Sequence, residues 1–200
     1  FYAPAPMGEN GFLRFLSVLC AMQKLSMDDL GRLSPEAFKA AAKLPLIIIL
    51  DNIRSMHNVG SVFRTADAFL CEHIMLCGDT PRPPHRDIHK TALGATETVD
   101  WSYFKETTET LADARQKGYA VFSVEQAVDS ISSEKMDTLN TLQPEGLANG
   151  LVLVLGNEVQ GVDQQIIDLS DGCLEIPQYG TKHSLNISVA AGIVIWEASK

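Results

Sequence analysis

The chain has 200 residues, of which 46% are hydrophobic and 20% are charged. These values are typical of one globular domain with a short extra arm, and no apolar run is long enough to span a bilayer. The formal net charge of −9 disfavours nucleic acid as a partner unless the basic residues gather on one face.

The first part of the chain lacks a basic region followed by a small-residue cleavage site, so we do not expect a secretory signal. Met22 is a natural initiator, and the stretch before it is expected to lie upstream of the native protein or to be an addition to it. A helix is predicted over Ser26–Lys43, with Ser34 and Pro35 as a helix start and Pro45 as its stop. We therefore expect three parts: residues 1–21, a helical arm at 22–45 and a folded domain at 46–200.

Two continuous apolar runs, Leu46–Leu50 and Leu151–Leu155, predict strands that are buried on both faces of a parallel sheet. Shorter strands are predicted between helical patterns, and residues 130–150 are polar and irregular. Because strands and helices alternate, the predicted class is α/β with a mainly parallel sheet and helices on both faces. The further predicted strands are 74–77, 99–104, 119–124 and 173–176, and the predicted helices are 58–69, 85–93, 106–117, 163–169 and 184–199.

The four cysteines match neither a zinc site nor a disulfide framework in their spacing. Reduced and mostly buried thiols in a cytoplasmic protein are the favoured interpretation. The cysteines are Cys20, Cys71, Cys77 and Cys173.

Three polar segments follow predicted strands, where α/β proteins place their ligand sites. They are residues 51–66, 156–161 and 176–192. Taken singly, each has an ordinary explanation. In the first, Asn58 caps a helix and Arg64 is a surface residue in an ion pair. The second is a glycine turn with a solvated Glu158, and the third is a capped helix whose small residues pack closely.

Taken together and in this order, the three segments closely resemble the signature motifs of the SpoU/TrmH family of RNA 2'-O-ribose methyltransferases. That family carries Asn-x-Gly-x-x-x-Arg-Thr/Ser-Ala, then Gly-x-Glu-x-x-Gly, then Ile-Pro followed by Ser-Leu-Asn-x-Ser-x-Ala. The matching positions are Asn58, Gly60, Arg64, Thr65 and Ala66; Gly156, Glu158 and Gly161; and Ile176, Pro177, Ser184, Leu185, Asn186, Ser188 and Ala190.

The resemblance covers about residues 46–200 and implies a fold in which the C-terminal segment, about 172–200, threads through a loop as a deep trefoil knot. It also implies that S-adenosylmethionine is the cofactor and that two copies pack through the last helix and the helix after the first motif. The cofactor would be held by main-chain groups near Val124, Gly156, Ile176 and Leu185.

The implied reaction is attack of a ribose 2'-hydroxyl of tRNA or rRNA on the cofactor's methyl group. The resemblance assigns removal of the hydroxyl proton to Arg64, helped by an RNA phosphate. Because guanidinium stays protonated in proteins, the physically favoured role is to fix the phosphate and stabilise the developing alkoxide. The expected catalytic residues are Asn58, Arg64, Glu158, Ser184 and Asn186.

Basic residues and four of the five histidines gather between Arg54 and Lys90, which predicts an RNA-binding face. His85 and His89 are four apart and would share one helix face, a spacing also found in zinc sites. No third ligand is evident and the transfer needs no metal, so RNA contact is favoured. The expected RNA-binding residues are Arg54, His57, Arg82, His85, Arg86 and Lys90.

Two alternatives keep the same fold: a catalytically silent RNA-binding protein, and a knotted methyltransferase that modifies a base nitrogen. The intact Asn58, Arg64, Glu158 and Asn186 favour an enzyme, and the Ser-Leu-Asn sequence favours ribose. A third alternative is an unrelated doubly wound nucleotide-binding enzyme. It lacks support because neither a dinucleotide fingerprint nor a phosphate-binding loop is present.

Overall fold

The structure is a computed structural model that describes residues 24–26, 28–139 and 149–200. The chain divides into two units, residues 1–34 and 35–200. The described part of the first unit contains a short 3-10 helix, η1 (Asp28–Leu30). The predicted helix over 26–43 is wrong in its extent, because Gly31 has a left-handed φ of 57° and only α2 (Pro35–Ala40) is α-helical.

The second unit is built on a seven-stranded sheet in the order β3-β2-β1-β6-β4-β7-β5. Every pairing within the described sheet is parallel, which confirms the predicted α/β class. The two apolar runs are central neighbours, with Leu46 opposite Leu151 and Leu50 opposite Leu155. The strands are β1 (Leu44–Asp51), β2 (Cys71–Cys77), β3 (Trp101–Phe104), β4 (Ala120–Val124), β5 (Ile131–Ser132), β6 (Leu151–Leu155) and β7 (Gly172–Glu175).

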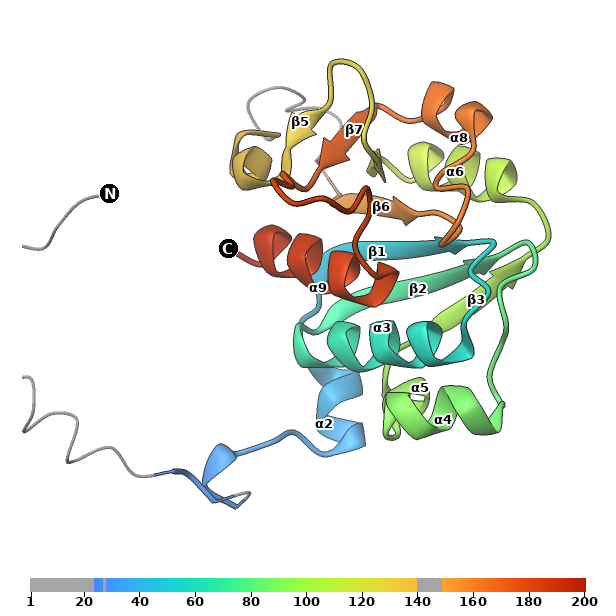
Figure 1. The fold of residues 1–200 in the computed structure, drawn as a ribbon. Coiled ribbons are helices and arrows are strands. Elements are labelled where there is room, and N and C mark those ends of the chain that lie inside the picture. Colours follow the sequence, from blue (N-terminus) through green and yellow to red (C-terminus); the bar gives the residue numbers. More distant parts are fainter. Residues whose placement is uncertain (1–23, 27, 140–148) are drawn as a thin grey trace, which may run out of the picture. The chain divides into compact units, whose positions relative to one another are not determined.

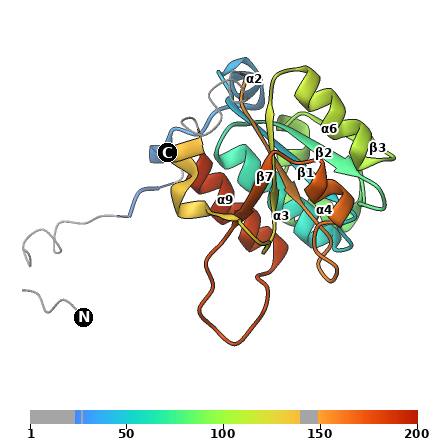
Figure 2. The same cartoon turned by 90° about the horizontal axis from the view of Figure 1, so that it is seen from above.

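Helices cover both faces of this sheet, as Figures 1 and 2 show. Alternate residues of β1 enter two separate cores: Ile48 and Leu50 join the core that includes residues of α3 and α9, whereas Ile47 and Ile49 join the core that includes residues of α6 and α8. This double burial explains why β1 lacks polar alternation. The helices are α3 (Met56–Ala68), α4 (Arg86–Ala92), α5 (Ala95–Thr98), α6 (Thr107–Gln116), α8 (Gln164–Asp168) and α9 (Ile187–Ala198).

The shortest elements were not predicted. Helix α5 spans four residues, β5 spans two, and a 3-10 helix, η2 (Ser133–Thr138), lies in the stretch expected to be irregular. Residues 140–148 of that stretch, and Cys20, lie outside the described residues. The other three cysteines are free and buried, in agreement with the prediction.

Helices α3 and α4 approach closely because residue 60 is a glycine. A Cβ placed on Gly60 would overlap the Thr91 hydroxyl and the main-chain oxygen of Ile88. The Thr91 hydroxyl also donates a 3.0 Å hydrogen bond to the carbonyl of His57. Helix α4 is therefore joined directly to the start of α3. Among the described residues, we find no helix with the length and apolar character that a membrane span requires.

Candidate active site

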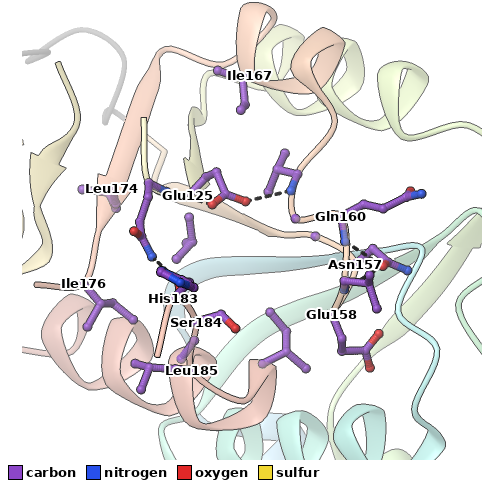
Figure 3. A pocket seen from close by; sticks show the side chains of 18 of the residues that line it. Glu125, Asn157, Glu158, Gln160, Ile167, Leu174, Ile176, His183, Ser184 and Leu185 are labelled. Carbon is purple, nitrogen blue, oxygen red and sulfur yellow. Dashed lines mark hydrogen bonds between the residues drawn. The ribbon is translucent and has the colours of Figure 1, made fainter. Parts of the chain in front are cut away.

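A cavity of about 490 Å³ lies at the carboxyl ends of β4, β6 and β7, beside the segment that leads into α9 (Figure 3). Ligand sites of α/β sheets occur at such strand ends, and this volume suits a small molecule. The four residues predicted to hold a cofactor all line it: Val124, Gly156, Ile176 and Leu185.

One wall of the cavity is the tight loop after β6. Asn157 and Gly161 exchange two main-chain hydrogen bonds of 3.0 and 2.9 Å, and the Asn157 side chain accepts from the main-chain N–H groups of Val159 and Gln160. Gly161 has a φ of 73°, and a Cβ on Gly156 would overlap the main chain of Gly161. Both glycines are therefore required for this loop to close on itself.

Glu125 and Gln126 directly follow β4 and connect it to two other walls of the cavity by hydrogen bonds. Neither residue was predicted from the sequence. One carboxylate oxygen of Glu125 accepts a 2.9 Å hydrogen bond from the main-chain N–H of Val162. The Gln126 side chain donates to the carbonyl of His183 at 2.8 Å. Both residues directly follow a predicted strand, and the rule that named Val124 applies equally to its next two neighbours.

Glu158 joins the second motif to the first. Its carboxylate accepts hydrogen bonds from the main-chain N–H groups of Arg54 at 2.8 Å and Ser55 at 3.0 Å, and from the side-chain amide of Asn58 at 3.0 Å. Burial by itself would raise the pKa of Glu158, but these three donors together lower it below the ordinary value. The carboxylate is therefore held charged and fixed in position.

Asn58 extends this network to the third motif, because its side-chain oxygen accepts from the Asn186 amide at 3.2 Å. Asn186 is the N-cap of α9 and accepts from the main-chain N–H of Ser188 at 2.9 Å. The prediction that Asn58 caps α3 is wrong. Ser55 is the N-cap and accepts from the Asn58 main-chain N–H, because α3 begins earlier, at Met56.

Arg64 lies apart from this network. It is an exposed residue of α3 and does not line the cavity of its own chain. Among the described residues Arg64 has no ion-pair partner, so the surface ion pair that would explain it is absent. Of the five residues expected to be catalytic, Glu158 and Ser184 line the cavity. Asn58 is hydrogen-bonded to Glu158, and Asn186 is hydrogen-bonded to Asn58.

The residues expected to bind RNA lie in three places. Arg54 and His57 lie at the start of the first motif, where Arg54 also binds Glu158 through its main chain. Three others lie at α4, where His85 is the N-cap and Arg86 and Lys90 are exposed helix residues. The guanidinium carbon of Arg82 lies over the Tyr103 ring, 4.0 Å from the ring centre. The described residues contain no group of three or more side chains suited to a metal ion.

Comparison with known proteins gives a match to the model of the SpoU rRNA Methylase family over residues 45–196. The 23S rRNA (guanosine-2'-O-)-methyltransferase RlmB of Neisseria meningitidis is 30% identical over 78% of this chain and 58% of its own length. The tRNA (guanosine(18)-2'-O)-methyltransferase of Aquifex aeolicus is 27% identical over 78% of this chain and 69% of its own. The chain thus spans little more than half of the first relative.

Two solved structures are similar to about four fifths of the chain. The A. aeolicus TrmH/SpoU tRNA modifying enzyme has a TM-score of 0.69 at 26% identity, over 82% of this chain and 78% of that one. The AdoMet-bound rRNA methyltransferase from Sinorhizobium meliloti has a TM-score of 0.68 at 25% identity, over 78% and 59% of the two chains.

Proposed function

The chain belongs to the SpoU rRNA Methylase family, and from this membership we propose that it transfers a methyl group from S-adenosylmethionine to a ribose 2'-hydroxyl of tRNA or rRNA. The observation that carries the proposal is the hydrogen-bonded junction of all three motifs, through Glu158, Asn58 and Asn186, beside a cavity that the second and third motifs line. The relatives named for 2'-O-methylation of rRNA and tRNA support the same reaction.

The cavity suits S-adenosylmethionine in size and in the character of its lining. Val124, Ile176 and Leu185 offer apolar surface for an adenine ring, and the glycine-built loop at Gly156 offers main-chain groups that a larger residue would cover. When bound, the cofactor supplies a methyl group made electrophilic by its positive sulfur. The protein's part is to hold the ribose in line and to stabilise charge on its oxygen.

In our proposal, Arg64 fixes an RNA phosphate and stabilises the developing alkoxide, and Ser184 contacts the ribose at the mouth of the cavity. Glu158, Asn58 and Asn186 position the loops that carry these groups. Because Arg64 does not line the cavity of its own chain, it would serve the cavity of a second copy. We therefore include a homodimer in the proposal.

Helix α9 supports a dimer through its exposed apolar side chains. Val189 is 51% and Trp196 is 53% exposed, and Trp196 packs edge-on against Phe69, which follows α3, with ring centres 5.8 Å apart. Exposed apolar surface of this kind marks interfaces. The face formed by α3 and α9 would thus bring Arg64 of one copy towards the partner's cavity.

We also propose the trefoil knot of residues 172–200 within a methyltransferase domain at 46–200, preceded by an extension at 1–45, in a cytoplasmic protein. Two features support the knot. Strand β7 lies between β4 and β5 in the sheet, although it comes last in the chain. Gln126, in the connection from β4 to β5, also binds the carbonyl of His183 beyond β7.

The direct test incubates the purified protein with methyl-labelled S-adenosylmethionine and total tRNA or rRNA, then digests the RNA to nucleosides. We expect the label on ribose 2'-oxygen. Label on a base nitrogen would identify the base-modifying alternative. Absence of transfer, together with no heat of S-adenosylmethionine binding in calorimetry, would identify the silent RNA-binding alternative. Mapping 2'-O-methyl sites in RNA from a strain that lacks the gene would then identify the nucleotide.

A further inference from the structure

A second cavity, of about 550 Å³, lies away from the candidate active site, between α4, α5 and the first residue of β3. Its walls include Pro83, Pro84 and Trp101, and its rim includes basic side chains of α4. The cavity has the size of a small-molecule site. None of the three motifs contributes a residue to it, whereas three of the residues expected to bind RNA line it: His85, Arg86 and Lys90.

Among the residues that line the cavity, Trp101 indicates most about the kind of ligand that would bind. It is partly buried and packs against the hydrophobic core, and it begins β3, the strand at one edge of the sheet. Among the described rings, none is stacked against the indole. Among the described residues the indole N–H has no hydrogen-bond acceptor, and it is not fully buried. A planar aromatic surface with an adjacent donor suits the face and edge of a nucleobase.

The rim supplies positive charge in a chain that is acidic overall. His85, Arg86, His89 and Lys90 all line the cavity and are exposed. Lys90 pairs with Asp87 at 2.6 Å, whereas Arg86 has no carboxylate partner among the described residues. Glu97 is the acidic group in the lining. An aromatic wall beside an uncommitted guanidinium is the combination that binds a base and its phosphate.

From this arrangement we propose that the cavity between α4, α5 and Trp101 binds one unpaired nucleotide of the substrate RNA, with its base on the indole and its phosphate at Arg86. The inference rests on the proposed function and narrows its substrate to RNA with an unstacked nucleotide near the methylated one. A base inside a duplex is stacked on its neighbours and could not enter.

A hydrogen bond and a close helix contact join the helix beside this cavity to the first motif. Thr91 of α4 donates to the carbonyl of His57, the residue before Asn58, and Gly60 lets the two helices touch. A nucleotide held against α4 therefore keeps a constant relation to the Asn58–Glu158 network. The cavity would thus set which nucleotide of the strand reaches the ribose position.

The test uses the full chain and single-stranded hexaadenylate as the probe. The chain contains two tryptophans, Trp101 and Trp196, so the Trp196→Phe variant leaves Trp101 as the sole indole emitter. We expect saturable quenching of its fluorescence, because a base stacked on the indole quenches it. Absence of quenching while the probe binds would overturn the proposal, because the probe would then be bound elsewhere.

Affinity is measured separately, by the anisotropy of dye-labelled hexaadenylate. Trp101→Leu is expected to weaken binding by about ten-fold, the loss that removing one stacked base contact produces. Arg86→Ala should weaken it by roughly five-fold through loss of a phosphate contact. The control Lys117→Ala removes a cation that pairs with Asp113 on α6, on the other face of the sheet, and should leave binding unchanged.

Two further measurements separate this inference from the proposed function. Calorimetry with S-adenosylmethionine should give the same affinity for Trp101→Leu and the wild type, which shows that the variant is folded. If wild type methylates RNA but Trp101→Leu binds hexaadenylate with unchanged affinity, the cavity inference is wrong and the function stands. If quenching occurs but no RNA is methylated, nucleotide binding in the cavity stands and the proposed function is wrong.

Discussion

Two regions use their polar groups in opposite ways. One is the junction of the three motifs, formed by Glu158, Asn58 and Asn186, and the other is the outer face, formed by the exposed side chains of α3 and α4. At the junction, Glu158 has three hydrogen-bond donors and Asn58 is bonded through both ends of its amide. On the outer face, neither Arg64 nor Arg86 has an ionic partner among the described residues. The first region is complete within the chain, whereas the second is complete only with an external anion.

The largest effect should come from the outer face. Arg64→Ala is expected to lower kcat for methyl transfer by about 10²–10³-fold, the loss caused by removing one group that stabilises an oxyanion. Binding of S-adenosylmethionine should not change, because Arg64 does not line the cavity of its own chain. Radiolabel transfer and calorimetry measure the two quantities. An equal loss of kcat and of S-adenosylmethionine affinity would show that Arg64 supports the junction, as Glu158 and Asn58 do.

The loop beside the junction tests whether its shape depends on glycine. Gly161→Ala places a side chain at a φ of 73° and against the Glu125 carboxylate, so we expect S-adenosylmethionine to bind about ten-fold more weakly, from a strain of about 1–2 kcal/mol. Gly180→Ala is the matched control, since nothing lies within 4 Å of its Cβ. Similar affinities for both variants would show that the loop tolerates a Cβ.

Glu158→Gln keeps the shape of the side chain but replaces one carboxylate oxygen with an NH2 group. This group would face the N–H donors that bind the carboxylate in the wild type. We expect the free energy of unfolding to fall by about 1–3 kcal/mol, the cost of a hydrogen-bonding group left without a partner. Urea unfolding measures the change, with the exposed Glu109→Gln as the control. An unchanged stability would mean that the junction is held by packing alone.

The smallest effect is a dependence on pH. Because the folded pKa of Glu158 lies below its ordinary value, its contribution to stability is present above that ordinary pKa. It is lost as the pH falls through the lowered folded pKa. The difference in unfolding free energy between wild type and Glu158→Gln should therefore be constant near neutrality and shrink in acid. A difference that grows in acid would contradict the assigned cause.

The sequence predicts those parts of the fold that burial dictates. Strands β1 and β6 were predicted because both faces of each are covered, which makes the apolar runs continuous. Helix α5 and strand β5 were missed because four and two residues are too few to show a period. The start of α3 was misplaced because Ser55 and Asn58 are both good caps, and only geometry selects Ser55.

The candidate site divides in the same way. The four residues predicted to hold the cofactor came from the motifs and from strand ends, and all of them line one cavity. Glu125 was missed because a single carboxylate after a strand carries no pattern of its own. The position of Arg64, exposed and outside the cavity, could not be predicted from spacing, since a separation of six residues from Asn58 does not reveal whether the side chain faces the cavity of its own chain.

The Asn58 amide has a further consequence for how this chain can change. Its nitrogen donates to Glu158 and its oxygen accepts from Asn186, across separations of 100 and 128 residues. If any one of Asn58, Glu158 and Asn186 is replaced by a residue that donates where the original accepts, or accepts where it donates, two donors or two acceptors face each other. Chimaeras built with a distant homologue should therefore be functional when all three segments are transplanted as a set, and defective when one is transplanted alone.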